Sequence, residues 1–226
     1  MPFQNIKPIT VLCQDNTKTT ALSTIYSAIV CVLYHAGVLA EYNRLFNNST
    51  GVYAFKKTGV GVKQHIAKAR KQSMAGALNA AALLDFIAND TSRSSEDRYD
   101  IALITESLHW TYGSPRLVGG VGMQHQGSVV TYADLLYILQ SVNGESGLTK
   151  FNLFLKMRTV HELGHVFGLW PNTAPINATD EEMAQAHCPN YCVMYWTLKE
   201  DFIEKIRTRP FCPSCLAQLK SFFIKR

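Results

Sequence analysis

The sequence lacks the features that mark several classes of protein. Charged residues fill only 17% of its 226 positions, and the formal net charge is +5. A nucleic-acid-binding protein usually gathers more positive charge, so we expect no nucleic-acid partner. Internal repeats and low-complexity tracts are also missing. Hydrophobic residues make up 47% of the chain, which is typical of a folded domain with a substantial core.

Long uninterrupted hydrophobic runs are missing as well. The most apolar window, 19–40, contains polar side chains such as Ser23, Tyr34 and His35, which a membrane-spanning helix rarely carries. We therefore predict a buried core helix there and no membrane partner. The residues before it, 1–18, have neither the basic start nor the small-residue cleavage site of a secretory signal.

The six cysteines are too few for a disulfide scaffold in a chain of this length, so we expect a cytoplasmic protein. Four of them lie close together in the last part of the sequence, as two pairs: Cys188 and Cys192, and Cys212 and Cys215. Two such pairs are typical of a tetrahedral zinc site with four thiolate ligands. Cys13 and Cys31 have no such neighbours, and we expect them in the core.

The spacing of apolar residues predicts alternating strands and helices in an N-terminal lobe, 1–168. We expect helices at 20–45, 62–87 and 148–169. Strands are expected at 9–13, 51–55, 101–105, 116–122 and 127–132. The remainder, 169–226, is predicted to be a small irregular C-terminal lobe of the same domain, which spans 1–226.

The motif that carries chemistry is His161-Glu-Leu-Gly-His165 on the last predicted helix of the N-terminal lobe. Histidines four residues apart lie on one face of a helix, so both imidazoles can bind one metal ion. Glu162 is rotated about 100° from that face, beside the ion but outside its ligand set. A carboxylate in that place can take a proton from a metal-bound water. Without a metal, burial of two imidazoles and a carboxylate among these apolar neighbours would be costly.

A third ligand must come from farther along the chain. Gly168 lets the helix end in a left-handed turn that leads the chain back toward the ion. In H-E-x-x-H-x-x-G-x-x-H proteins the third histidine follows three residues later, but here that position is Pro171, which has no ligand atom. The remaining candidates are His187, Glu181 and Glu182.

With its cysteines included, this stretch resembles the archaemetzincins, zinc-dependent peptidases of the metzincin clan. Their pattern is H-E-x-x-H-x-x-G-x-x-H-C-x4-C-x-M-x17-C-x-x-C. The first half is matched by His161, Glu162, His165 and Gly168, and the second by His187, Cys188, Cys192, Met194, Cys212 and Cys215. The 17-residue interval is kept in full. The resemblance is specific over 160–215 and only architectural over the rest of the N-terminal lobe.

The resemblance implies a metzincin-like α+β fold. It would have a mixed, mostly parallel twisted sheet with helices, an active-site helix, and a C-terminal lobe with a four-cysteine zinc site. It also implies a zinc metallopeptidase with two zinc ions, one catalytic and one structural, and a peptide as substrate. An extended peptide would pair with an edge strand supplied by 119–132.

The resemblance also assigns roles to single residues. The ligands of the catalytic zinc would be His161, His165 and His187. Glu162 would be the general base, and Met194 would form the turn beneath the ion. The ligands of the structural zinc would be Cys188, Cys192, Cys212 and Cys215.

Two features depart from the family pattern. The first cysteine pair is separated by three residues instead of four, and 18 residues, 169–186, stand between Gly168 and His187, where the family has two. The insertion leaves Glu181 or Glu182 open as the third ligand, as in thermolysin-type enzymes. His187 is bonded directly to Cys188, so the second zinc can anchor it while the insertion loops out. We favour His187, because Gly168 and Met194 belong to the metzincin pattern.

The insertion also leaves a second function open. If 169–186 lies over the cleft, the protein would be a zinc-stabilised module that binds peptides or a partner protein with little or no turnover. For either function we expect a monomer.

Overall fold

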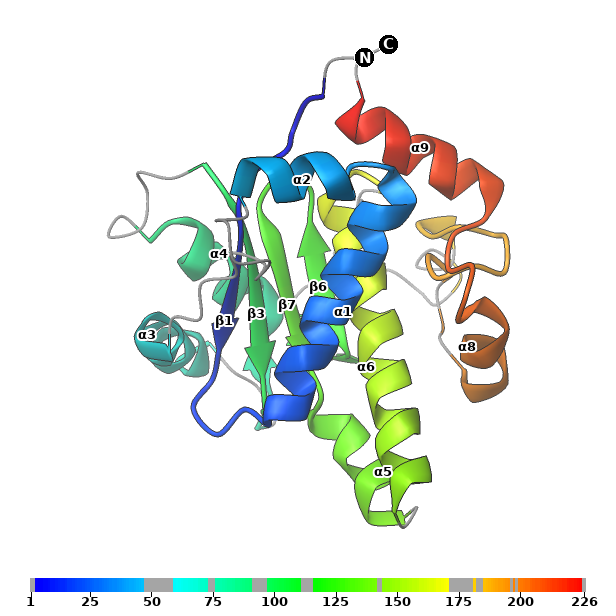
Figure 1. Cartoon of the computed structure of the whole chain (residues 1–226). Helices are drawn as coiled ribbons and strands as arrows, with labels where there is room; N and C mark the ends of the chain where they lie inside the picture. Colours follow the sequence, from blue (N-terminus) through cyan, green and yellow to red (C-terminus); the bar gives the residue numbers. More distant parts are fainter. Residues whose placement is uncertain are drawn as a thin grey trace.

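The computed structural model describes residues 3–46, 59–72, 76–90, 97–110, 116–141, 144–170, 181, 185–195, 197 and 199–224. They form an α+β fold in which helices cover both faces of a central sheet (Figure 1). The predicted fold class is therefore confirmed. The strand expected at 51–55 lies outside the described residues.

The central sheet is mixed and mostly parallel, as predicted. Its strand order is β1 (Ile9–Cys13), β3 (Tyr99–Ile104), β7 (Gly127–Thr131) and β6 (Gly120–Met123). The first three run parallel, and β6 pairs antiparallel with β7. Because β6 ends the strand order, one of its edges is free among the described residues.

The two faces of this sheet are covered by different helices. Alternate residues of a strand point to opposite faces, and in β1 the side chains of Val11 and Leu12 belong to separate hydrophobic clusters. On the Val11 face lie α1 (Thr19–Ala36) and α6 (Glu145–Val166). On the Leu12 face lie α3 (Gly59–Arg70) and α4 (Ala80–Ala88).

The helix predicted at 20–45 is two helices, because Gly37 interrupts it. Gly37 has φ 76°, and its backbone N–H donates to the carbonyls of Leu33 and Tyr34, which ends α1. The chain then enters α2 (Leu39–Phe46). By length and hydropathy α1 meets the criteria for a membrane span, and 44% of it is buried. Its buried side packs against α6, as predicted for a core helix.

The single helix predicted at 62–87 is wrong. The segment contains α3, a short strand β2 (Leu78–Asn79) and α4. Gly76 has φ +77°, a left-handed conformation that ordinary residues avoid, and the Asn79 side chain caps α4 by accepting from the Ala82 N–H at 2.9 Å. These local turn and cap interactions override the helical spacing of the apolar residues.

A second, smaller sheet was not predicted. Its order is β2, β4 (Leu108–Trp110) and β5 (Arg116–Val118). The strand expected at 116–122 is therefore divided between two sheets, with Gly119 at the junction of β5 and β6.

The C-terminal part of the chain packs against the N-terminal lobe. After β7 come the 3-10 turn η2 (Ala133–Leu135), α5 (Leu136–Ser141) and α6, and later α8 (Glu200–Ile206) and α9 (Pro213–Phe223). Phe223 of α9 packs edge-on against Phe167 at 4.9 Å between ring centroids. The two ends of the described chain meet, since Phe3 and Ile224 form a β-bridge (Figure 1).

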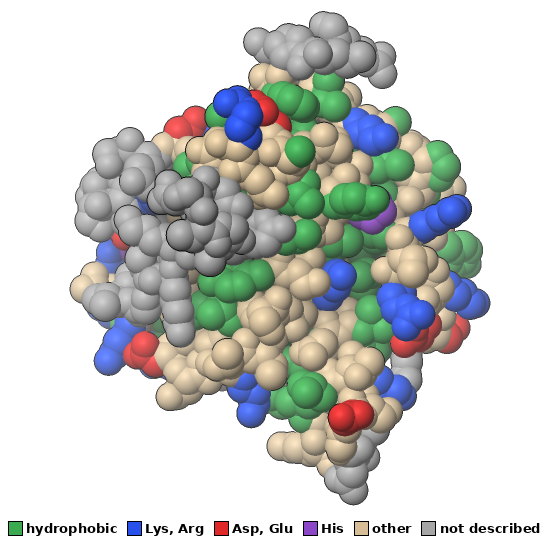
Figure 2. Space-filling view, viewed as in Figure 1, with side chains coloured by type: hydrophobic (Ala, Val, Ile, Leu, Met, Phe, Trp, Pro, Cys, Tyr) green, Lys and Arg blue, Asp and Glu red, His purple; other side chains and the backbone are tan. Residues whose placement is uncertain are grey.

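The surface over α1 and α2 carries scattered charge. Figure 2 shows Lys and Arg side chains spread singly over this face, with apolar side chains between them. The exposed apolar groups of the described residues include Tyr34, Leu117, Tyr137 and Tyr191.

Candidate metal centre

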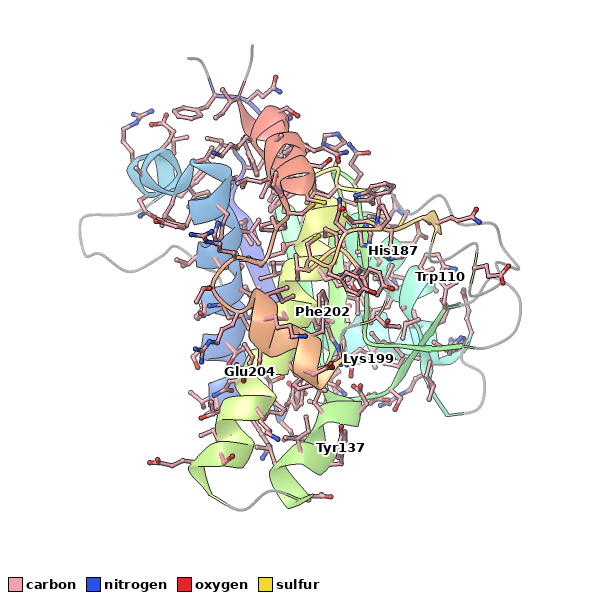
Figure 3. The ribbon with its side chains drawn as sticks, turned by 90° about the vertical axis from the view of Figure 1, so that its right-hand side faces the viewer. Trp110, Tyr137, His187, Lys199, Phe202 and Glu204 are labelled. Atoms are coloured by element: carbon pink, nitrogen blue, oxygen red, sulfur yellow. The ribbon has the colours of Figure 1, made fainter. Side chains whose placement is uncertain are left out.

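Three histidines meet at the C-terminal end of α6. His161 and His165 lie one turn apart on the helix, and their Nε2 atoms are 3.2 Å from each other. His187 comes from the segment after the insertion, and one ring nitrogen of each histidine lies within 4.8 Å of the others. All three rings are buried. Figure 3 shows His187 on the face that it turns to the viewer, in front of α6.

The hydrogen bonds of the two helical histidines fix which nitrogen carries the proton. His161 Nδ1 is 2.7 Å from the Val193 carbonyl oxygen, and His165 Nδ1 is 2.7 Å from that of Trp170. A carbonyl oxygen only accepts, so Nδ1–H must be the donor in both rings. Each Nε2 therefore carries a lone pair, and the two lone pairs face each other across 3.2 Å.

Such an arrangement suits a cation between the two nitrogens. Zinc binds imidazole nitrogen at about 2.0–2.1 Å in a tetrahedron, which places two ligand nitrogens about 3.3 Å apart. The observed separation of 3.2 Å matches this geometry. The residues present therefore fit a zinc ion.

The buried surroundings of His161 and His165 also keep their imidazoles in the neutral form, which binds metal. In the protein without metal, burial lowers the pKa of His161 well below its ordinary value and lowers that of His165 to about 4. The neighbouring histidines lower both further. Neutral imidazoles are thus favoured over the whole physiological range of pH.

Glu162 lies beside this cluster and is not one of its members. Its side chain is buried, and in the absence of metal this burial raises its pKa to about 8. The guanidinium of Arg158 and the Gly122 N–H, which donates to the carboxylate, both act in the opposite direction. Arg158 is itself held by a bidentate ion pair with Asp134, with both N···O distances 2.7 Å. A cation on the histidines would also favour the charged carboxylate.

Glycines in strand β6 let this strand lie directly against α6. A Cβ atom on Gly122 would stand 2.2 Å from the backbone oxygen of Glu162, and one on Gly120 would stand 2.8 Å from the Glu162 Cγ. Backbone atoms cannot yield as a flexible side chain can. The close approach that brings the free edge of β6 beside Glu162 therefore depends on these glycines.

Gly168 and Met194 shape the floor of the site. Gly168 has φ +77°, and the N–H of Leu169 donates to the Gly164 carbonyl, so α6 ends in a left-handed turn. This turn carries the Trp170 carbonyl back onto His165. Met194 is fully buried and packs against Gly164, between the two histidines of the helix.

The four cysteines of the C-terminal lobe form a second cluster. Their sulfur atoms all lie within 4.8 Å of one another. Cys188 Sγ and Cys212 Sγ are 3.7 Å apart, and Cys192 Sγ and Cys215 Sγ are 3.8 Å apart. Tetrahedral zinc with Zn–S bonds of about 2.3 Å requires sulfurs about 3.8 Å apart, whereas a disulfide requires about 2.05 Å. The cluster fits zinc.

In the absence of metal, the thiols of Cys192 and Cys215 differ in pKa. The hydrogen bond between Cys192 and Cys215 lowers the pKa of the Cys192 thiol to about 5 and raises that of Cys215. The Cys192 thiol therefore loses its proton more readily than the Cys215 thiol. Cys13 and Cys31 belong to neither cluster and lie in or against the core, as expected.

The cysteine cluster holds parts of the histidine cluster in place. His187 is bonded to Cys188, whose N–H donates to the Met194 carbonyl at 3.0 Å. Val193, which follows Cys192, supplies the carbonyl that orients His161. His161 and His187 are therefore both positioned by the segment that carries Cys188 and Cys192.

Of the two glutamates considered as the third ligand, the structure describes only Glu181. Glu181 is exposed and outside the cluster, and Glu182 lies outside the described residues. Tyr191 and Tyr195 stack on each other with ring centroids 5.0 Å apart and pack against Phe202. Most of the 169–186 insertion also lies outside the described residues.

Sequence reasoning missed the groups that support the site. These are the carbonyls of Val193, Leu169 and Trp170, the Arg158 guanidinium, and the glycines Gly120 and Gly122. The one signal available was the Gly119-Gly-Val-Gly122 run within a predicted strand, because glycine in a strand often marks a close backbone approach.

Comparison with solved structures agrees with this architecture. An archaemetzincin from Methanopyrus kandleri aligns with a TM-score of 0.54 over 97% of this chain and 97% of its own, at 21% identity. The chain has an archaemetzincin fold. An archaemetzincin from Archaeoglobus fulgidus aligns with a TM-score of 0.49 over 93% of this chain and 99% of its own, at 15% identity. No model of a protein family and no curated protein matches the sequence.

The archaemetzincin fold joins the two clusters, so loss of one should weaken the other. We predict that Cys212→Ser lowers the zinc affinity of the histidine cluster by about 10- to 100-fold, as loss of supporting groups does in other metal sites. Competition with a chromophoric chelator measures both classes of site. Cys31→Ser, outside both clusters, is the matched control and should change neither affinity. An unaltered histidine-site affinity in Cys212→Ser would show that the clusters are independent.

Gly122→Ala should destabilise the fold more than an ordinary glycine replacement. The added methyl group meets the Glu162 backbone, so we expect a loss of about 1–3 kcal/mol in the free energy of unfolding beyond that of Gly37→Ala. Gly37 has no atom within 4 Å of its added Cβ and suffers only its left-handed strain. Urea unfolding of both zinc-loaded variants makes the comparison. Equal losses would mean that β6 and α6 can separate without cost.

Acid should destabilise the metal-free protein through the buried histidines. The folded state lowers the pKa of His165 from 6.5 to about 4, so below pH 6.5 the unfolded chain binds more protons and stability falls. Glu162 has the opposite effect on stability, because folding raises its pKa and acid therefore favours the folded state through this group. Glu162→Gln removes this contribution and is the reference protein. Adding His165→Gln to it should reduce the loss of stability between pH 7 and pH 4.5, measured by urea unfolding with chelator present. Identical pH profiles for the two proteins would contradict this.

Proposed function

We propose that the protein is a zinc-dependent metallopeptidase of the archaemetzincin family that hydrolyses peptide bonds, with Glu162 as general base. The observation that carries the proposal is the pair of facing Nε2 lone pairs with a buried carboxylate beside them. When bound, zinc would polarise the scissile carbonyl and lower the pKa of the attacking water. His161, His165 and His187 would hold this ion, and the four cysteines would hold a structural one.

Glu162 has the surroundings that a proton carrier needs. Its carboxylate is buried, so its pKa differs from that of a carboxylate in bulk water. The Gly122 N–H donates to the carboxylate and holds it in one orientation. It would take the proton of the attacking water at a carboxylate oxygen and deliver it to the leaving amine nitrogen. Arg158, fixed by Asp134, favours the charged form that accepts the proton.

The free edge of β6 supports an extended peptide as substrate. The Thr131 N–H donates to the Gly119 carbonyl at 2.9 Å, so residues 119 and 131 form a hydrogen-bonded pair. Such pairs alternate along an antiparallel ladder, so Val121 and Met123 also turn their backbone groups toward β7. The backbone groups of Gly120 and Gly122 then point to the free edge, beside Glu162. The Gly122 N–H is taken by the Glu162 carboxylate, so a peptide would pair through the other backbone groups of these two residues, with little regard to its sequence.

Glu162→Gln should remove catalysis and keep the metal. We expect kcat for a peptide substrate to fall by at least about 100-fold, the scale of general acid–base catalysis. Zinc content should be unchanged, because the carboxylate is outside the ligand cluster. A quenched-fluorescent peptide library with mass analysis of the products is the assay.

Two controls accompany this variant. Glu145→Gln changes an exposed carboxylate at the other end of the same helix and should retain full activity. Removal of zinc by a chelator should abolish cleavage, and added zinc should restore it. Cleavage that survives both the chelator and Glu162→Gln would exclude this function, and zinc-dependent peptide binding without cleavage would favour the binding module.

A further inference from the structure

A cavity lies on the face of the sheet opposite to the histidines. It has a volume of about 420 Å³ and opens between α4, β4 and the end of β6. The residues that give it chemical character are Asp85, Asn79, Gln72, Gln126, Trp110 and Met123.

Strand β6 connects this cavity to the proposed peptide track. Gly120 and Gly122 face α6, since atoms added to them meet Glu162. Val121 and Met123 face the other way and pack in the cluster that contains α4. Residues directly opposite each other on paired strands share a face of the sheet. A peptide residue paired opposite Met123 would therefore direct its side chain toward the cavity.

The direction of the peptide sets where this residue lies relative to the cleaved bond. Antiparallel pairing is the more stable arrangement per residue. In an antiparallel peptide the residue opposite Met123 precedes those opposite Gly122 and Gly120, which adjoin Glu162. It therefore lies on the amino-terminal side of the scissile bond.

The chemistry of the lining favours a cation. Asp85 is the only formally charged residue among the described residues that line the cavity. Its Oδ1 accepts a hydrogen bond from the Asn89 side chain at 2.8 Å, and no described residue forms an ion pair with it. Asp90, Asp100, Asp134 and Glu106, by contrast, each have a basic partner.

The remaining groups suit the rest of a long basic side chain. The Trp110 ring offers an aromatic surface of the kind that cations and their methylene stems favour. The amide side chains of Asn79, Gln72 and Gln126 complete the polar part of the lining. Charge-assisted hydrogen bonds to a carboxylate are stronger than neutral ones. We infer that this cavity is a specificity subsite for a lysine or arginine side chain on the amino-terminal side of the scissile bond, an inference that rests on the proposed function.

Cleavage of matched peptides tests the subsite. The peptides in each set are identical except at one position on the amino-terminal side of the scissile bond, which holds lysine, norleucine or glutamate. A separate set is made for each such position. With the zinc-loaded full chain we expect kcat/KM at one position to be roughly tenfold higher for lysine than for its uncharged analogue norleucine. Asp85→Asn should reduce this preference to near unity, and Asp85→Lys should shift it to glutamate.

Asp15→Asn is the matched control. Asp15 is likewise exposed, follows β1, and does not line the cavity, so its replacement removes the same charge and should leave the preference intact. A lysine preference that persists in Asp85→Asn, or the absence of a basic preference at every position, would overturn the inference.

A binding measurement separates failure of the subsite from failure of the peptidase. Fluorescence anisotropy of the labelled lysine and norleucine peptides is measured on zinc-loaded Glu162→Gln, with and without Asp85→Asn. If no peptide is cleaved but lysine binds more tightly only when Asp85 is present, the subsite stands and the proposed function fails. If peptides are cleaved and neither cleavage nor binding depends on Asp85, the proposed function stands and the subsite is wrong.

Discussion

The structure depends on two imidazole nitrogens held close together with their lone pairs facing. Backbone carbonyls of Val193 and Trp170 fix the protons on the opposite nitrogens, so His161 and His165 present Nε2 to each other at 3.2 Å. In a buried site such a contact is unfavourable unless a cation lies between them. The turn at Gly168 and the segment around the four cysteines both serve to supply those carbonyls. Metal binding is therefore built into the backbone as well as into the side chains.

A second constraint is the contact between strand β6 and helix α6. The glycines at 120 and 122 remove the side chains that would separate the two elements. The same closeness lets the Gly122 N–H reach Glu162 and leaves the free strand edge beside it. The free strand edge, the buried Glu162 carboxylate and the histidine cluster thus all lie beside the C-terminal part of α6. The side chains of Val121 and Met123 alternate with these glycines and lie on the other face of the sheet, where Met123 lines the cavity.

Much of the site was predictable because its chemistry depends on spacing. The i, i+4 histidines and the two cysteine pairs are local patterns that can be recognised without knowing how the chain packs. The structure brings the members of each set together. His187 required the resemblance, because 18 residues separate it from Gly168. The supporting carbonyls were not predictable, since every residue has one. In the fold, strand 9–13 follows from apolar patterning and the mixed sheet from the resemblance, whereas the break at Gly37 and the cap at Asn79 are local interactions that override the apolar pattern.

One ion bound by Nε2 of His161, Nε2 of His165 and a ring nitrogen of His187 is the arrangement on which the site depends. It is tested most directly by a crystal structure of the zinc-loaded protein with anomalous data at the zinc edge. We expect one anomalous peak about 2.0–2.1 Å from a nitrogen of each of His161, His165 and His187, and a second peak among the four sulfurs. A single peak at the cysteines, with the histidine nitrogens still facing each other without an ion, would contradict it.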